Sequence, residues 1–266
     1  MWREWRDRPT VGHDMQSGSI RLFKVFGIEV FLHFSWFIIA AYQMTARRHG
    51  YTSPIFALYE YLALFAIVLM HEFGHALACR QTGGIANRIM LWPLGGIAFV
   101  QPPPRPGAQL WAIAAGPLVN VVLLPILFVA QIVGTQLGLQ WRAPDASRLL
   151  HMVALINLSL LVFNLFPIYP LDGGQILRSL LWFPFGPIRS LQVASAIGIV
   201  GSALAGVAAV LYFQSIWIGI MAFFLISQAV AGWRHAQAMA ADEREARLAP
   251  QIILEPAEAE PRPPMI

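Results

Sequence analysis

The sequence has 266 residues, of which 57% are apolar and only 12% are charged, and its mean hydropathy is +0.59. Soluble domains contain about 25% charged residues, so this chain lacks the polar surface that a soluble protein of its length needs. The composition also excludes a disordered chain, and a single cysteine, Cys79, excludes an intramolecular disulfide. We therefore interpret the chain as a multi-pass membrane protein.

Long segments without Asp, Glu, Lys or Arg predict where the chain crosses the membrane. A helical span needs about 20 apolar residues, and the uncharged run 190–233 is long enough for two spans with a turn between them. The fold class that we predict is an all-α polytopic membrane protein with six transmembrane helices. The six predicted spans are Gly27–Ala46, Ile55–Cys79, Leu110–Leu137, Leu149–Phe166, Leu191–Leu211 and Ile216–Met239.

The distribution of basic residues predicts the orientation of these spans. With the N-terminus in the cytoplasm, 14 of the 18 Lys and Arg residues fall on the cytoplasmic side and 4 on the other. Both termini are therefore expected in the cytoplasm. The basic residues are scattered among loops and do not cluster on one face, so nucleic-acid binding is not expected.

The segments outside the spans predict a small sheet and two tails. Ser19–Val30 and Ile85–Val100 are rich in β-forming residues, so we expect them to build a membrane-associated sheet on the cytoplasmic side. The predicted domains are a flexible N-terminal tail at 1–18, a six-span domain at 19–239 and a cytoplasmic tail at 240–266. In that tail the last helix is expected to continue briefly before disorder begins near Pro250.

The second predicted span carries the pattern H-E-x-x-H, formed by His71, Glu72 and His75. Residues four apart lie on one face of a helix, so the two imidazoles can bind one metal ion. Glu72 lies beside them and can activate a water molecule for attack. Ionisable residues in an apolar helix are costly unless they meet a partner or water. The pattern therefore predicts a metal site, and a purely structural polar cluster is the weaker interpretation.

A catalytic zinc ion needs a third protein ligand and one open position. Asp172 is the strongest candidate because it follows an uncharged span at the point where Pro167 and Pro170 break the helix. The basic-residue count places this acid and the H-E-x-x-H pattern near the same side of the membrane. An ordinary helix N-cap is the alternative role for Asp172, and it is compatible with metal binding.

Three other residues are weaker candidates for the third ligand. Cys79 lies on the same helical face but about 12 Å along the axis from His71, so we expect a packed thiol there. His33 and His151 are each isolated in the sequence. His33 can instead form a hydrogen bond near the site, and His151 can mark a span boundary.

Two motifs together resemble a known family. H-E-F-G-H at 71–75 is followed about 90 residues later by N-x-x-P-x-x-P-L-D-G at 164–173, a pairing that resembles the site-2 protease family of intramembrane zinc metalloproteases. Supporting matches occur at 27–36, 94–96 and 115–120, so the resemblance extends over residues 18–235.

The resemblance implies a role for each matching residue. The zinc ligands that it implies are His71, His75 and Asp172, with one Zn²⁺ ion per chain. Glu72 matches the general base, and Asn164 matches an asparagine that stabilises the oxyanion or orients the substrate. Asn120 is assigned to helix packing or substrate contact, and Gly95 and Gly96 to substrate contact.

The resemblance also implies the activity, which is hydrolysis of peptide bonds in transmembrane proteins or peptides, within or near the cytoplasmic side of a bacterial cytoplasmic membrane. The segment 82–109 is too short for an inserted PDZ domain, and the tail after Met239 is too short for paired CBS domains. A catalytically inactive relative that binds membrane partners is the alternative, and a metal transporter is weaker because no internal repeat is present. The sequence indicates neither the substrate nor the oligomeric state.

A stripe of small residues and a predicted strand region allow interpretations that involve a substrate. Gly198, Ser202 and Gly206 form a stripe of small residues on the fifth predicted span, which indicates either tight helix packing or a substrate gate. The predicted strand region Ile85–Val100 can hold an unwound substrate by strand addition.

Overall fold

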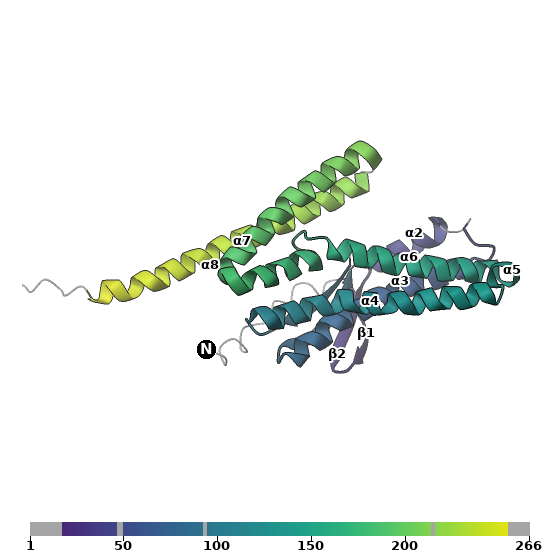
Figure 1. Ribbon diagram of the computed structural model, residues 1–266, viewed down its shortest axis with the longest axis horizontal. Helices are drawn as coiled ribbons and strands as arrows, with labels where there is room; N and C mark the ends of the chain where they lie inside the picture. The colour runs from purple at the N-terminus through teal and green to yellow at the C-terminus, as the bar shows by residue number, and fades with distance from the viewer. Residues whose placement is uncertain (1–17, 47–49, 93–94, 214–215, 255–266) are drawn as a thin grey trace, which may run out of the picture. The chain divides into compact units, whose positions relative to one another are not determined.

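The computed structural model describes residues 18–46, 50–92, 95–213 and 216–254 (Figure 1). Of these described residues, 77% are helical, and the rest include one small sheet. The chain divides into two compact units, residues 1–164 and residues 165–266. The tail predicted at 1–18, apart from its last residue, and the stretch 255–266 lie outside the described residues.

The sheet in the first unit has four strands in the order β1-β2-β3-β4. The strands are β1 (Ser19–Val25), β2 (Ile28–His33), β3 (Ile85–Trp92) and β4 (Gly95–Gln101). The pairs β1–β2 and β3–β4 are antiparallel, whereas β2 and β3 are parallel. Phe26 and Gly27 both have positive φ, as the tight hairpin turn between β1 and β2 requires. The two segments that we predicted to form a sheet do form one.

The first predicted span is wrong over its first third. Residues 28–33 form β2, in which fully and partly buried side chains alternate with the period of two that is typical of a strand. Only Ser35–Ala46 is helical, as α2. Its 12 residues measure about 18 Å, less than the hydrocarbon thickness of about 30 Å. The apolar run that we interpreted as one helix is therefore a strand followed by a short helix.

The other helices of this unit are α3 (Ile55–Gln81), α4 (Pro106–Gln136), the short α5 (Leu139–Arg142) and α6 (Pro144–Leu165). Helix α3 packs against α4 (Figure 1) and also contacts strands β3 and β4. A side chain at Gly74 would place its Cβ 2.6 Å from the carbonyl oxygen of Ala115, so glycine allows α3 and α4 to approach closely. The buried apolar residues between these elements form the core, which includes Ile28, Val30, Val68, Ala76, Ile89, Leu91 and Ala112.

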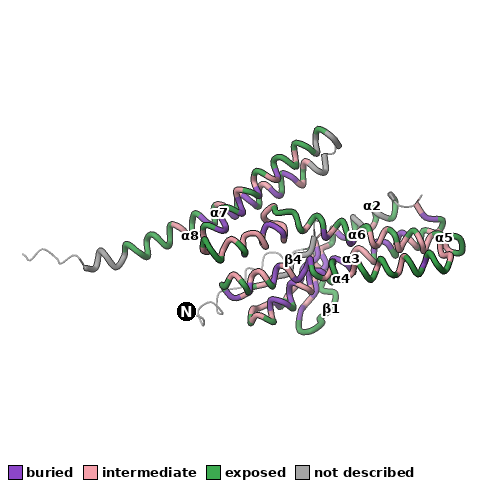
Figure 2. The backbone as a smooth tube through the Cα atoms, in the orientation of Figure 1, coloured by how far each residue is buried: buried purple, intermediate pink, exposed green. Residues whose placement is uncertain are grey.

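The second unit consists of α7 (Asp172–Phe213) and α8 (Ile216–Leu254), which pack along each other. Helix α7 is kinked at Gly186, which has a φ of 79° and lies between Pro184 and Pro187. Helix α8 continues beyond Pro250, where we expected the helix to end. Residues 241–248 of this helix are exposed and are drawn in green in Figure 2.

Among the described residues, four helical segments are long and apolar enough to cross a membrane. They are α3, α4, α6 and residues 172–208 of α7. Their length and composition make this an integral membrane protein. The count of six spans and the side of the membrane on which the sheet lies stay predictions.

Candidate metal centre

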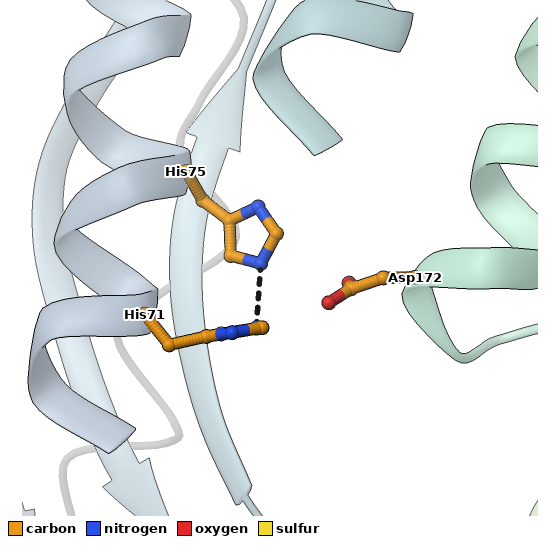
Figure 3. Close-up of side chains that lie close together, drawn as sticks. All are labelled: His71, His75 and Asp172. Atoms are coloured by element: carbon orange, nitrogen blue, oxygen red, sulfur yellow. Dashed lines mark hydrogen bonds between the residues drawn. The ribbon is translucent and has the colours of Figure 1, made fainter. Parts of the chain in front are cut away.

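Helix α3 holds the H-E-x-x-H residues in the interior of the first unit. His71, Glu72 and His75 are each at most 5% exposed. The spacing predicted that the two imidazoles share one face of the helix, and their Nε2 atoms lie 3.1 Å apart (Figure 3). An apolar helix therefore brings two potential ligand atoms together in its buried part.

A backbone carbonyl orients His75. The Nδ1 atom of its ring lies 2.9 Å from the carbonyl oxygen of Ala112 on α4. A carbonyl oxygen only accepts hydrogen bonds, so Nδ1 is the ring nitrogen that carries the proton and donates. The Nε2 atom of the neutral ring is then unprotonated, and its lone pair points toward His71.

Two buried asparagines form a hydrogen-bonded chain that ends at His71. The Nδ1 atom of His71 lies 2.6 Å from Oδ1 of Asn120 on α4. The Nδ2 group of Asn120 donates to Oδ1 of Asn157 on α6 at 2.8 Å, and Nδ2 of Asn157 donates to the backbone oxygen of Asn120 at 3.0 Å. Both asparagines are fully buried. Hydrogen bonds therefore connect all three long helices of the unit at this level.

The pair of imidazoles fits a zinc ion. Zinc–nitrogen bonds of 2.0–2.1 Å at a tetrahedral angle place two ligand nitrogens about 3.3 Å apart. The observed separation of 3.1 Å is close to that value. Hydrogen bonds from Nδ1 to an oxygen are the usual way in which proteins orient zinc-binding histidines. The local geometry therefore fits two imidazole ligands of one metal ion.

Gly116 on α4 leaves the space that the ring of His75 occupies. A Cβ atom at this position would lie 2.2 Å from Nε2 and 2.4 Å from Cε1 of His75. Such distances are far below van der Waals contact, so any side chain here would displace the ring. The sequence showed Gly116 as part of a motif, and the structure gives the physical reason for glycine.

Asp172 is the first residue of α7, in the second unit, and its side chain is also drawn in Figure 3. The helix break predicted before it is present, because α6 ends at Leu165 and α7 begins at Asp172. The connection folds tightly over the two glycines that follow. A Cβ at Gly173 would lie 2.3 Å from the carbonyl oxygen of Leu165, and a Cβ at Gly174 would lie 2.3 Å from the backbone nitrogen of Tyr169.

The remaining predicted site residues have different surroundings. Asn120 is fully buried against His71 and Asn157, so its contacts support a packing role and offer no surface to a substrate. Asn164 lies in the last turn of α6. Gly95 and Gly96 begin β4, opposite Trp92 and Leu91 of β3. Substrate contact at these two glycines stays a prediction.

The weaker candidates for the third ligand have other surroundings. The thiol of Cys79 is buried and lies 3.5 Å from the carbonyl oxygen of Ile85, as expected of a packed thiol. His33 is hydrogen-bonded to Ser35 and stacked on Trp92 with ring centroids 4.4 Å apart. His151 is exposed on α6.

Comparison with known proteins gives consistent results. The profile of peptidase family M50 matches residues 59–142 and 132–208. The chain belongs to peptidase family M50. Among solved structures, the site-2 protease of Methanocaldococcus jannaschii superposes with a TM-score of 0.58 at 28% identity, and the match covers 81% of this chain and 95% of that protein.

Two curated relatives of this M50 chain extend the comparison. A zinc metalloprotease of Methanocaldococcus jannaschii is 33% identical over 68% of this chain and 50% of its own length. Stage IV sporulation protein FB of Bacillus subtilis is 33% identical over 51% of this chain and 46% of its own length. The M50 chain thus spans about half the length of these relatives.

Sequence reasoning missed Asn157 and Ala112, which both help to orient the histidines. Asn157 gave a usable signal, because an amide in an apolar span is costly without a partner. Ala112 gave no signal, because its backbone carbonyl orients His75 and any residue type supplies a backbone carbonyl.

Proposed function

We propose that this chain is an intramembrane zinc metalloprotease that hydrolyses peptide bonds of transmembrane proteins or peptides. The observation that carries the proposal is the buried pair of imidazole Nε2 atoms, 3.1 Å apart on an apolar helix. Membership of family M50 supports the reaction class.

The zinc site that we propose combines two imidazole nitrogens with one carboxylate oxygen. Its ligands are His71, His75 and Asp172, and it holds one Zn²⁺ ion per chain. Three protein ligands of these types are typical of catalytic zinc and leave a fourth position open. Zinc bound there would polarise a peptide carbonyl and favour loss of a proton from water near neutral pH.

Glu72 and Asn164 carry the other steps. Glu72, buried beside His71, takes the proton of the attacking water and delivers it to the amine that leaves. The side-chain amide of Asn164 donates a hydrogen bond to the oxyanion that develops on the scissile carbonyl. One such donor is worth about 2.7–4 kcal/mol in the transition state.

The substrate that we propose is a transmembrane helix that unwinds near the cytoplasmic face of a bacterial membrane. Six spans and two cytoplasmic termini complete the proposed topology. A helix hides its peptide bonds, so the cleaved segment must become extended. Strand β4 is an edge of the sheet and offers backbone groups to such a segment. Proline substitutions along β4 should then reduce cleavage while zinc stays bound.

The first experiment measures the zinc content of the detergent-purified protein beside Asp172→Ala and Glu72→Gln. About one zinc ion per wild-type chain is expected, with loss or weaker binding in Asp172→Ala. Glu72→Gln should keep its zinc. Absence of zinc from the wild type after resupply would exclude the proposed mechanism.

Cleavage then separates an active protease from an inactive relative. A panel of fluorescently labelled single-pass helices is incubated with the wild type and with Glu72→Gln in proteoliposomes. Turnover by the wild type alone is expected, because only the glutamate moves the proton. A wild type that holds zinc but cleaves no member of the panel would favour the inactive binding protein.

A further inference from the structure

The side-chain amide of Asn120 determines which nitrogen of His71 carries the proton. If the amide presents Oδ1 to Nδ1 of His71, that nitrogen must donate, and Nε2 keeps a lone pair for a metal ion. If the amide presents its NH₂ group instead, Nδ1 becomes the acceptor and the proton moves to Nε2. The second arrangement places a proton where zinc must bind.

The orientation of Asn120 follows from Asn157. The backbone oxygen of Asn120 only accepts, and it lies 3.0 Å from one end of the Asn157 amide, so that end must be the NH₂ group. The other end of Asn157 is then its carbonyl oxygen, which accepts from Nδ2 of Asn120 at 2.8 Å. Oδ1 of Asn120 is therefore the atom that faces His71, at 2.6 Å.

Burial makes this order of donors and acceptors strict. Asn120 and Asn157 are both 0% exposed, so water does not replace a lost partner. Reversing either amide would bring two donors or two acceptors together in a low-dielectric interior, where a mismatched polar group is expensive. The backbone carbonyl of Asn120 on α4 thus fixes the amide of Asn157 on α6. That amide fixes the side-chain amide of Asn120, which in turn determines the proton position on His71 of α3.

We infer that Asn157 is a positioning residue for the metal site, which acts through Asn120 to hold His71 with its proton on Nδ1 and Nε2 ready to bind zinc. The inference rests on the proposed function, because it takes His71 as a zinc ligand. Asn157 itself touches neither the imidazole nor the metal.

Two substitutions at Asn157 separate its effect on the orientation of the Asn120 amide from its contribution to helix packing. Asn157→Leu keeps the size of the side chain but removes the acceptor that faces Nδ2 of Asn120. Asn157→Asp, in its neutral form, keeps both hydrogen bonds, because its O–H donates to the backbone oxygen and its C=O accepts from Nδ2. Leu158→Ala, at a neighbouring position that is 44% exposed, serves as the control for a change on the same helix.

The first readout is zinc affinity, measured by competition with a chelator on proteins that elute as single species in detergent. Asn157→Leu is expected to weaken zinc binding about 10–100-fold, the usual effect of losing an outer partner of a zinc-binding histidine. Asn157→Asp and Leu158→Ala should stay within about threefold of the wild type. Equal weakening by Leu and Asp, or wild-type affinity in Asn157→Leu, would overturn the inference.

The second readout needs no metal. The zinc-free protein is labelled with ¹⁵N-histidine, and the signals of His71 are assigned from their loss in His71→Gln. Protonation on Nδ1 is expected in the wild type and in Asn157→Asp, with a second tautomer in Asn157→Leu. A wild-type Nδ1 without a proton would overturn the inference even if zinc binds. A wild type that binds no zinc but shows the Nδ1 tautomer would instead count against the proposed function.

Discussion

The two units of this protein join their helices by different means. In the first, α3 and α4 approach closely at Gly74, and buried polar side chains, namely His71, Asn120 and Asn157, add hydrogen bonds between α3, α4 and α6. In the second, α7 and α8 meet through small residues, and a Cβ added at Gly206 would lie 2.6 Å from Cβ of Ala222. Ser202 on the same α7 stripe is fully buried, and its hydroxyl has no hydrogen-bond partner among the described residues.

The difference follows from what each interface must do. Apolar side chains gain little by meeting each other in a membrane, so close packing and interhelical hydrogen bonds join the helices. Close packing brings backbones together but does not fix one atom of a side chain. Hydrogen bonds are directional and do fix it. The first unit uses them to fix a ring nitrogen of His71, which is a zinc ligand in the function that we propose. Along the stripe of small residues the second unit has no such side chain to orient.

The largest expected effect comes from Gly116→Ala, which tests the space beside His75. The new Cβ would lie 2.2 Å from Nε2 of His75, so the ring must move by an ångström or more. We expect zinc affinity to fall by more than about 100-fold, since displacements of this size are costly at a catalytic centre. Chelator competition measures the effect.

Gly107→Ala is the matched control on the same helix. A Cβ at Gly107 meets nothing within 4 Å, so this substitution should leave zinc binding unchanged and slightly favour the helix. Wild-type zinc affinity in Gly116→Ala would show that the site tolerates a shifted ring.

A smaller effect, on folding and not on zinc, is expected from Gly206→Ala in the second unit. The added methyl group would press against Cβ of Ala222 and force α7 and α8 apart. Overpacking of this kind costs about 1–3 kcal/mol of unfolding free energy. Thermal unfolding in detergent measures it.

The double variant Gly206→Ala with Ala222→Gly exchanges the two positions and removes the clash. It should regain most of the lost stability, because one helix gains the alanine that the other loses. A double variant no more stable than Gly206→Ala would refute direct packing and favour the alternative of a substrate gate along this stripe.

The sequence could predict features that depend on local spacing. The four-residue separation of His71 and His75 placed both rings on one face, and the prolines before Asp172 marked a helix break that the structure contains. Segments rich in β-forming residues located the sheet. The first span failed because Ile28–His33 is as apolar as a membrane helix, and its pairing with β3 outweighs that composition.

Features that depend on two or more helices could not be predicted in the same way. The contact between Asn120 and Asn157 joins residues 37 positions apart and requires α4 and α6 to meet at one level. The need for glycine at position 116 arises only once the ring of His75 lies against α4. Both belong to the polar interface of the first unit, where side chains from separate helices fix one another.

The smallest effect is expected from Tyr51→Phe, which removes one buried hydrogen bond of the first unit far along the chain from the histidines. The hydroxyl of Tyr51 donates to Oε2 of Glu60 at 2.7 Å, and both residues are buried. Phenylalanine keeps the ring, which stacks on Phe56 and lies beneath the guanidinium of Arg148. We expect a loss of about 0.5–1.5 kcal/mol in unfolding free energy, the usual net value of one intramolecular hydrogen bond.

Tyr42→Phe is the control for this last variant, because Tyr42 is 71% exposed and should lose almost nothing. Zinc affinity should match the wild type in both variants, since neither touches the asparagines behind His71. If Tyr51→Phe weakened zinc binding as strongly as Asn157→Leu, the polar interface would act as one cooperative network along α3. Orientation of His71 would then depend on the hydrogen bond between Tyr51 and Glu60 as well as on the two asparagines. The difference from the α7–α8 interface, which is packed through small residues, would become larger.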